Sequence, residues 1–387
     1  MAAPRPIYLD HQATTPLDPR VLEAMLPFLR EDFGNAASVT HAYGRRAAAA
    51  VDDARERIAS GIGAEPDEIV FTSGATEANN LAIQGSARLR PRHRNRLVSV
   101  ASEHPAVLDV LEALAAEGFE SQVVPVGPDG LVDPAAIEAA ICERTALVSV
   151  MAANNEIGVL QPLREIAASC RARGVPIHSD AAQAVGKIPV DVDELGVDLL
   201  SLCAHKFYGP KGVGALFVRK RRPRARLMPV QHGGGHEAGL RSGTLPVASI
   251  VGMARALELC LEELEAEAVR QRALCDALWE ALRSDCPGLI RNGHAEQRLP
   301  GNLNLRFDGV DAERLVLALH DVALSTGSAC TTASPRPSHV LLALGLSEAE
   351  ARSSLRIGVG RATTQGDIHL AAVRIAEEVR AQRSAAA

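Results

Sequence analysis

Lysine is rare in this sequence, so each lysine invites a chemical explanation. Lysine and arginine together number 41, and only four of these are lysine, at positions 187, 206, 211 and 220. Arginine stays protonated, whereas a lysine amine shielded from water can lose its proton and form an imine. Lys206 closes the run "LLSLCAHK", next to His205. We therefore predict that Lys206 forms a Schiff base with a carbonyl-bearing ligand.

Other reactive polar side chains also follow apolar, strand-like runs. "LVSVMAANNE" leads to Asn155, "VPIHSDAAQ" leads to Asp180 and Gln183, and "LVSVASEH" leads to His104. In an open parallel sheet, ligands bind beyond the carboxyl ends of the strands. We therefore expect these side chains to share a pocket with Lys206, although an ordinary surface histidine is an equally good interpretation of His104 alone.

A further strand-like run ends in a segment suited to a phosphate group. Residues 69–72 continue into Ser73-Gly74-Ala75-Thr76 and then into a helical pattern. Glycine lets the backbone approach a ligand closely, and the unpaired N–H groups of a helix N-terminus bind anions. Capping of the helix by Ser73 or Thr76 is the alternative interpretation.

Together these residues describe a site for pyridoxal 5′-phosphate (PLP). Lys206 would form the Schiff base, and Asp180 would keep the pyridine nitrogen protonated, so that the ring draws electrons. Asn155 would hydrogen-bond the phenolic oxygen, and His104 would lie over the ring face. The phosphate would bind at residues 74–76.

One cysteine lies in unusually polar surroundings. The sequence has 7 cysteines and no C-x-x-C pair, so free thiols are expected. Cys330 lies in "STGSACTTAS", which cannot build a core, and its small residues predict a mobile loop with an accessible thiol. By contrast, Cys142, Cys170, Cys260 and Cys275 lie in helical apolar patterns and are expected to be buried.

Composition narrows the class of protein. A chain of 387 residues predicts two domains, and 47% apolar residues suffice for their cores. The net charge of −6 argues against nucleic-acid binding, and the short basic run at 219–226 is predicted to be a solvated loop. No apolar run reaches the roughly 18 residues of a membrane helix, and no signal peptide is recognisable. We predict a cytoplasmic protein that binds neither membrane nor nucleic acid.

No metal site is predicted. The "HGGGH" motif at residues 232–236 has no third ligand nearby, and a loop near a subunit contact explains it better.

Strand-like runs alternate with helical patterns over most of the chain. This alternation predicts an α/β fold, with a large, mostly parallel sheet covered by helices on both faces. Residues 250–283 continue as a nearly unbroken helical pattern, typical of a link between domains. Shorter strands and helices then predict a smaller α+β domain. We place the large domain at residues 15–260 and the small domain at 1–14 with 261–387.

Eight motifs follow one another along the chain: "YLDHQATTP", "FTSGATEANNLAI", "SEHPAVL", "NNEIG", "HSDAAQAVGK", "AHKFYGPKG", "GGGHEAGLRSGT" and "STGSAC". In combination they closely resemble the cysteine desulfurases, in the NifS/IscS-like branch of the class V aminotransferase group. The likeness extends from about Ile7 to past Ile368. It implies the aspartate-aminotransferase-like fold of PLP enzymes (fold type I) and a homodimer.

The resemblance implies catalytic roles for individual residues. Lys206 carries the cofactor as a Schiff base and later moves protons, while His104 stacks on the cofactor. Cys330 is the nucleophile. Arg356 clamps the substrate carboxylate, a bidentate task that suits arginine, and Asn155 is assigned to the substrate as well as the cofactor.

The resemblance also implies a set of cofactor-binding residues. They are Ala75, Thr76, His104, Asn155, Asp180, Gln183, Cys203, His205, Lys206 and Thr244. In this set Asp180 pairs with the ring nitrogen, and Asn155 and Gln183 bond the phenolic oxygen.

Five of these residues are implied to surround phosphate groups. Ala75, Thr76 and His205 hold the phosphate of their own subunit, and Thr244 reaches the phosphate of the other subunit. Cys203 stands where many relatives carry a hydroxyl group, and a thiol is a weaker donor. This leaves one phosphate contact in doubt, and simple packing is the alternative role for Cys203.

The implied reaction removes sulfur from L-cysteine. The Cys330 thiolate attacks the substrate sulfur, L-alanine leaves, and Cys330 keeps a persulfide. An acceptor protein then takes the sulfur for iron–sulfur cluster or thio-cofactor assembly; a cluster scaffold and a thiolation carrier both remain open. A selenocysteine lyase or related PLP lyase is the alternative enzyme, and a non-catalytic protein that kept the fold is the alternative from another class.

Overall fold

The large sheet has seven strands. The computed structural model describes residues 5–91, 93–222, 224–326 and 336–386; Cys330 and its predicted mobile loop lie outside these residues. The strand order is β2-β8-β7-β6-β5-β3-β4. The strands are β2 (Ile69–Thr72), β3 (Arg96–Val100), β4 (Glu120–Val124), β5 (Thr145–Ser149), β6 (Ile177–Asp180), β7 (Leu199–Cys203) and β8 (Gly214–Val218).

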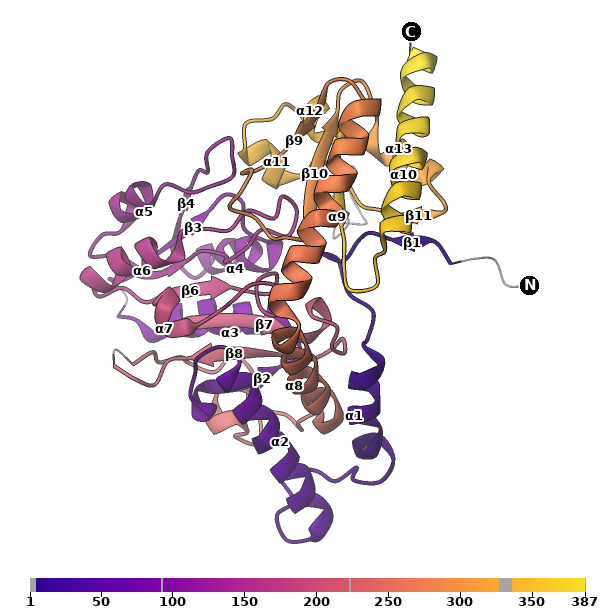
Figure 1. The fold of residues 1–387 in the computed structure, drawn as a ribbon. Coiled ribbons are helices and arrows are strands. Elements are labelled where there is room, and N and C mark those ends of the chain that lie inside the picture. The colour runs from indigo at the N-terminus through magenta and orange to yellow at the C-terminus, as the bar shows by residue number, and fades with distance from the viewer. Residues whose placement is uncertain (1–4, 92, 223, 327–335, 387) are drawn as a thin grey trace.

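Helices cover both faces of this sheet (Figure 1). They are α1 (Pro19–Arg30), α2 (Ala42–Ser60), α3 (Ala75–Leu89), α4 (Pro105–Ala115), α5 (Pro134–Ala140), α6 (Leu163–Ala172), α7 (Val192–Leu195) and α8 (Val247–Glu262). One core packs against α3 and α4, and a larger core packs against α2, α6 and α8. None of the helices in the described part of the chain combines the length and apolar character needed to cross a bilayer.

The strand sequences explain this burial. Every residue of β5, β7 and β8 is buried, as expected for strands covered on both faces. β8 runs antiparallel to β2 and β7, and the remaining neighbours pair in parallel. The predicted α/β fold with a large, mostly parallel sheet is confirmed.

The helical pattern of residues 250–283 forms two helices rather than one. α8 ends one residue before Glu263, and α9 spans Leu264–Asp285. The Glu263 carboxylate lies 2.8 Å from the Arg20 guanidinium and 2.8 Å from that of Arg361. These distant partners fix a break that the local pattern does not reveal. α8 and α9 still lead from the large sheet toward the smaller group of strands (Figure 1).

A smaller group of strands and helices has its own core. It contains an antiparallel sheet of order β12-β10-β9 and a parallel pair, β1 and β11. The elements are β1 (Ile7–Tyr8), β9 (Leu289–Arg291), β10 (Asn302–Phe307), α10 (Ala312–Ala318), β11 (Val322–Ala323), α11 (His339–Ala343), α12 (Glu348–Arg352), β12 (Ser354–Gly358) and α13 (Gln365–Ala386). N-terminal Leu9 packs in this core with Leu305 and Leu355. The predicted domain boundaries themselves stay a prediction.

Three short 3₁₀ turns complete the pattern in the described residues: η1 (Pro66–Glu68), η2 (Ala204–Lys206) and η3 (Glu237–Gly239).

Cysteine burial agrees with the sequence at three of four positions. Cys170, Cys260 and Cys275 are buried free thiols, as predicted. The prediction for Cys142 is wrong, because this residue is only partly buried. α5 ends at Ala140, so Cys142 lies in the connection to β5 and not on the buried face of a helix.

The prediction of a solvated loop at residues 219–226 is wrong for its first residues. Arg219 is 4% exposed, and its guanidinium donates to the backbone oxygens of Val192 (2.8 Å) and Val197 (2.7 Å). The same guanidinium reaches Asp193 Oδ1 at 2.5 Å. β8 carries Arg219 directly from the sheet onto these partners, which the sequence places more than twenty residues away.

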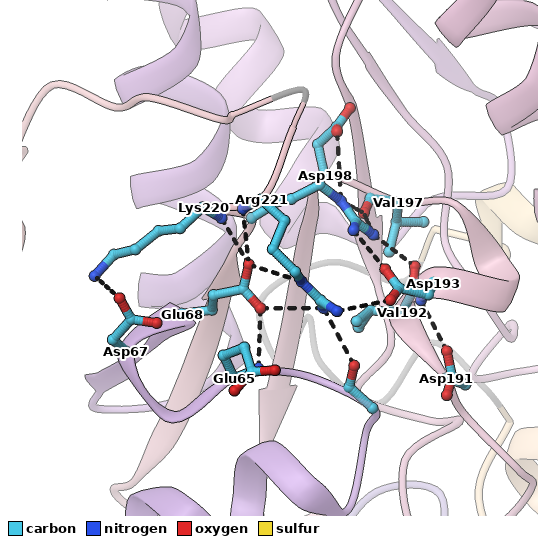
Figure 2. Close-up of polar contacts among 12 residues, drawn as sticks. Glu65, Asp67, Glu68, Asp191, Val192, Asp193, Val197, Asp198, Lys220 and Arg221 are labelled. Atoms are coloured by element: carbon cyan, nitrogen blue, oxygen red, sulfur yellow. Dashed lines mark hydrogen bonds and ion pairs between the residues drawn. The ribbon is translucent and has the colours of Figure 1, made fainter.

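Arg221 extends the same cluster to a buried carboxylate. Its guanidinium lies 3.2 Å from Glu68 Oε2 and donates to Asp193 Oδ2 at 2.7 Å. The Lys220 backbone N–H donates to Glu68 Oε1 at 2.7 Å, and Figure 2 shows Glu68 joined to both basic residues. We refer to Glu68, Asp193, Arg219 and Arg221 as the Glu68 network.

Candidate active site

A cavity of about 460 Å³ opens where β6 and β7 end and α3 begins. We refer to it as the strand-end cavity. Nine of the ten predicted cofactor-binding residues line it: Ala75, Thr76, His104, Asn155, Asp180, Gln183, Cys203, His205 and Lys206. The structure thus brings together residues that are up to 131 positions apart in sequence.

Lys206 ends the 3₁₀ turn that follows β7. Its Nζ donates to the backbone oxygens of Gln12 (2.6 Å) and Ala13 (2.8 Å). The segment after β1 therefore lies against the predicted Schiff-base lysine. The sequence analysis did not predict this contact, because every residue carries a backbone carbonyl and residue type does not show which carbonyl will accept a bond.

Asp180 closes β6 and is 5% exposed. Asn79 Nδ2 donates to Asp180 Oδ2 at 2.7 Å, and the Ala182 N–H donates to Oδ1 at 2.9 Å. These two bonds fix the plane of the carboxylate at the cavity wall. Asn79 was missed from the sequence, since either asparagine of "ANN" in α3 could have faced inward.

α3 begins at the strand-end cavity without a side-chain cap. Its N-cap residue is Gly74, whose φ is +155°, and no side chain caps the helix. Among the first N–H groups, that of Ala75 is directed at the Cys203 thiol. The alternative interpretation, capping by Ser73 or Thr76, is therefore wrong. A Cβ on Gly74 would have no atom within 4 Å, so the space beside the turn is open. Unpaired helix N–H groups beside open space suit an anion.

Both histidines of the cavity are held neutral. Burial lowers the pKa of His205 to about 4, with the charges of Lys206 and Lys211 adding to the effect. Burial also lowers the pKa of His104. His104 Nδ1 accepts the Ala106 N–H at 3.0 Å, which places the ring proton on Nε2.

Asn155 and Cys203 line the cavity as predicted, and each has a distinctive environment. Asn155 lies in the cavity wall, and its buried Oδ1 has no hydrogen-bond partner among the described residues. Cys203 is 1% exposed, and burial raises the pKa of its thiol to about 11, so the thiol stays protonated. This protonated state accords with a packing role that leaves at most a weak donor.

Arg356 and Thr244 do not line the strand-end cavity. Arg356 comes from β12 and is 2% exposed, and its guanidinium donates to Asp10 Oδ1 (2.8 Å) and to the Asn155 backbone oxygen (3.3 Å). The second bond joins it to the cavity wall. Thr244 is exposed on the surface of this chain.

The chain approaches and leaves residues 327–335 beside this site. The backbone N–H of Arg356 donates to the backbone oxygen of Ser325 at 2.7 Å. On the far side, Ser338 Oγ donates to Glu156 Oε2 at 2.5 Å, and His339 Nε2 lies 2.8 Å from the backbone oxygen of Glu103. Glu156 and Glu103 adjoin the cavity residues Asn155 and His104 in sequence.

The glycine-rich loop at 232–236 shows no arrangement of metal ligands. His236 Nδ1 accepts the Gly243 N–H at 3.2 Å, which ties the loop to itself. In the described part of the chain, no three histidine, cysteine or acidic side chains gather as a metal site would require.

Comparisons with known proteins agree with this geometry. The family described as "Aminotransferase class-V" matches residues 7–370. The cysteine desulfurase IscS of Anaeromyxobacter dehalogenans is 52% identical over 378 residues, which cover 98% of this chain and 93% of that protein. A mouse cysteine desulfurase is 50% identical over 98% of this chain and 82% of its own length.

Solved structures give the same result. A "NifS-like protein" superposes with a TM-score of 0.90 and 36% identity, over 97% of this chain and 99% of that one. "SspA in complex with cysteine" gives a TM-score of 0.82 and 38% identity, over 91% and 98%. The chain therefore belongs to the class V aminotransferase family and, within it, to the cysteine desulfurases.

Proposed function

We propose that this chain is a PLP-dependent cysteine desulfurase that moves the sulfur of L-cysteine onto Cys330 and releases L-alanine. The observation that carries the proposal is the strand-end cavity, in which a partly buried lysine amine, a fixed carboxylate and a helix N-terminus without a side-chain cap meet. The relative solved with cysteine supports the substrate.

The residues of the cavity fit PLP. Asp180 offers a fixed acceptor for a protonated ring nitrogen, and α3 offers free N–H groups near Thr76 for the phosphate. The amide of Asn155, with a buried atom left unpaired, can serve the phenolic oxygen or the substrate. Lys206 would hold the cofactor covalently. When bound, PLP supplies an electron sink that stabilises negative charge at the substrate Cα.

The remaining tasks fall to this chain's own residues. Lys206 Nζ takes the Cα proton of the substrate. His104 presents a neutral ring whose position is fixed by its bond to the Ala106 N–H. Arg356 binds the substrate carboxylate, and its buried guanidinium is already oriented by Asp10.

Cys330 completes the sulfur transfer. Its thiolate forms a bond to the substrate sulfur as the Cβ–S bond breaks, Cβ gains a proton, and the sulfur remains as a persulfide. The positions of Ser325 and Ser338 support this role, because these described residues on either side of Cys330 in the sequence bond Arg356 and Glu156, which adjoin the cavity residue Asn155.

A Cys330→Ala variant tests the proposal. We expect its turnover of L-cysteine to be abolished, while release of selenium from L-selenocysteine persists, because that step depends less on a nucleophilic thiol. The matched control is Cys142→Ala, which removes a thiol outside the cavity and should leave both activities unchanged. Full retention of L-cysteine turnover in Cys330→Ala would contradict the proposal. A protein that turned over only L-selenocysteine would be a selenocysteine lyase instead.

We also propose a cytoplasmic homodimer that passes its sulfur to an acceptor protein. An exposed apolar group on α1, α2 and their connection supports a subunit contact: Leu29 (57% exposed), Phe33 (68%), Val39 (64%) and Tyr43 (48%). Thr244 is exposed, as a residue serving the partner's phosphate would be. Sedimentation analysis tests the dimer. Trapping the Cys330 persulfide and identifying the protein that removes it tests the acceptor, either an iron–sulfur scaffold or a thiolation carrier.

A further inference from the structure

A second lysine lies beside the strand-end cavity without lining it. Lys187 lines a neighbouring enclosed space of about 30 Å³, together with His11 and Gln12. A space of that size holds about one water molecule. Lys187 Nζ donates to Gln183 Oε1 at 2.7 Å. Lys187 therefore contacts a residue of the cofactor site from outside that site.

This contact dictates the orientation of the Gln183 amide. A lysine ammonium carries only donors, so the atom of Gln183 that faces it must be the oxygen. The other end, Nε2, donates to the backbone oxygen of Gln12 at 2.8 Å. The same Gln12 oxygen accepts Lys206 Nζ at 2.6 Å. The NH₂ end of Gln183 and the amine of Lys206 thus share one acceptor.

The orientation of this amide has chemical consequences. The two ends of a glutamine amide differ only by the exchange of nitrogen and oxygen, so a small bias selects one of them. A phenolic oxygen accepts hydrogen bonds and requires the NH₂ end, whereas the flipped amide would oppose two oxygens. A buried mismatch of this kind costs about 1–3 kcal/mol.

Lys187 can act as a donor in either protonation state. Burial lowers its pKa to about 7, and the charge of Lys206 adds to this effect. Cys203 and Cys260 act in the opposite direction, and Arg356 adds to the lowering. The neutral amine keeps two N–H groups and can still donate to Gln183, while the Gln12 backbone oxygen, which can only accept, favours the same orientation of the amide.

We propose that Lys187 is a positioning residue that holds the Gln183 amide with its NH₂ group toward the phenolic oxygen of the cofactor. The inference rests on the proposed PLP-dependent function.

The test measures the pH midpoint of the visible absorption band in purified holoenzyme, a readout separate from turnover. In Lys187→Met the amide loses the donor that holds its oxygen and keeps only the bond to Gln12, so its NH₂ group should serve the phenolic oxygen less well. The phenolic oxygen then carries more negative charge, which favours protonation of the neighbouring Schiff-base nitrogen that joins Lys206 to PLP. The pH midpoint of the visible band should therefore rise by about one unit. In a Gln183→Ala background, Lys187→Met should produce no further shift.

Two outcomes would overturn this inference alone. One is an unchanged midpoint in Lys187→Met. The other is an equal shift in both backgrounds, which would show that the charge of Lys187 acts directly. A wild-type protein with no visible band, even after addition of PLP, would instead overturn the proposed function together with this inference.

A second variant keeps the test independent of the fold of Lys187→Met. Gln183→Glu leaves Lys187 in place and presents oxygen at both ends of the side chain. It should raise the midpoint as Lys187→Met does, and thermal unfolding should show an intact fold. A Gln183→Glu enzyme with the wild-type midpoint would show that the NH₂ end is not needed and would refute the proposal.

Discussion

The Glu68 network and the strand-end cavity lie at opposite ends of the large sheet. Glu68 precedes β2, whereas Asp180 closes β6, and β2 has the direction of β7 because both run antiparallel to β8. In the network, Glu68 accepts from the backbone N–H groups of Glu65 (3.0 Å) and Lys220 (2.7 Å) and pairs with Arg221. No buried side-chain atom of the four network residues is left without a partner.

The strand-end cavity shows the opposite pattern. Asn155 Oδ1 in its wall is a buried atom without a hydrogen-bond partner in the described part of the chain, and so are Asn79 Oδ1 and Glu103 Oε2 on residues just outside the lining. Native structures leave few such atoms, and each requires an explanation. Both regions are buried and polar, so polarity alone does not identify a functional site. An unpaired buried atom beside an open cavity is a better indication, because a ligand in the cavity can bond it.

The largest expected contrast between the two regions concerns their lysines. Lys206→Ala should lose the visible cofactor band and reduce L-cysteine turnover by about 10⁴-fold, because both the attachment point and the proton carrier are gone. Lys220→Ala is the matched control. It removes one ion pair to exposed Asp67 and should leave turnover and the band unchanged. Comparable losses in the two variants would erase the functional distinction between the two ends of the sheet.

A pair of Glu→Gln substitutions should have opposite effects on stability. Glu68→Gln places an NH₂ group among donors and should lower the free energy of unfolding by about 2 kcal/mol at neutral pH. Glu103 is fully buried, and burial next to Asp180 raises its pKa well above the usual range. Glu103→Gln removes the cost of protonating this carboxyl group on folding at neutral pH and should leave stability unchanged or higher. Denaturant unfolding of both variants measures the two values.

The stability of these two variants relative to the wild type depends on pH, because the carboxyl groups that they replace have shifted pKa values. Its N–H donors and Arg221 hold the pKa of Glu68 below its usual value. Its stabilising contribution is therefore present above about pH 4.5 and is lost as the pH falls through the lowered pKa. Glu103 has a raised pKa, so its contribution is present at low pH and lost as the pH rises. The deficit of Glu68→Gln should shrink in acid, and a deficit independent of pH would contradict this assignment.

The smallest effect is expected at a residue that supports Asp180. Asn79→Ala removes one hydrogen bond to the carboxylate and should lower kcat about 10-fold, with little change in KM. Asn95→Ala, which removes a bond to the Gly118 backbone oxygen on the surface, is the control. An unchanged kcat in Asn79→Ala would mean that the Ala182 N–H alone orients Asp180.

The sequence predicted the parts of the site that sit at strand ends. Lys206, Asp180 and Asn155 each lie at or after the end of a strand-like run, and the parallel sheet brings such ends together by geometry. Contacts made through backbone atoms could not be predicted in this way. The carbonyl of Gln12 that holds Lys206 depends on the path of the chain and not on a side chain.

Two of the incorrect predictions share one physical origin, which is pairing over long sequence separation. The run at 219–226 has the composition of a solvated loop, yet Arg221 pairs with Glu68 across 153 positions. The pattern at 250–283 is continuous, yet Glu263 interrupts it where Arg20 and Arg361 converge. A local pattern records propensity, and these distant ion pairs outweigh it.

The position of the N-terminal segment has a consequence for biosynthesis. Strand β1 leaves the ribosome first, but its partner β11 follows more than 300 residues later, and the bridge from Asp10 to Gly358 forms later still. Contacts of such long range are slow to form. A nascent chain can therefore assemble the large sheet early but cannot place Gln12 beside Lys206 until translation is nearly complete. Interrupted translation products would carry both Lys206 and the N-terminal segment, but would lack β11 and Gly358, which hold that segment in place.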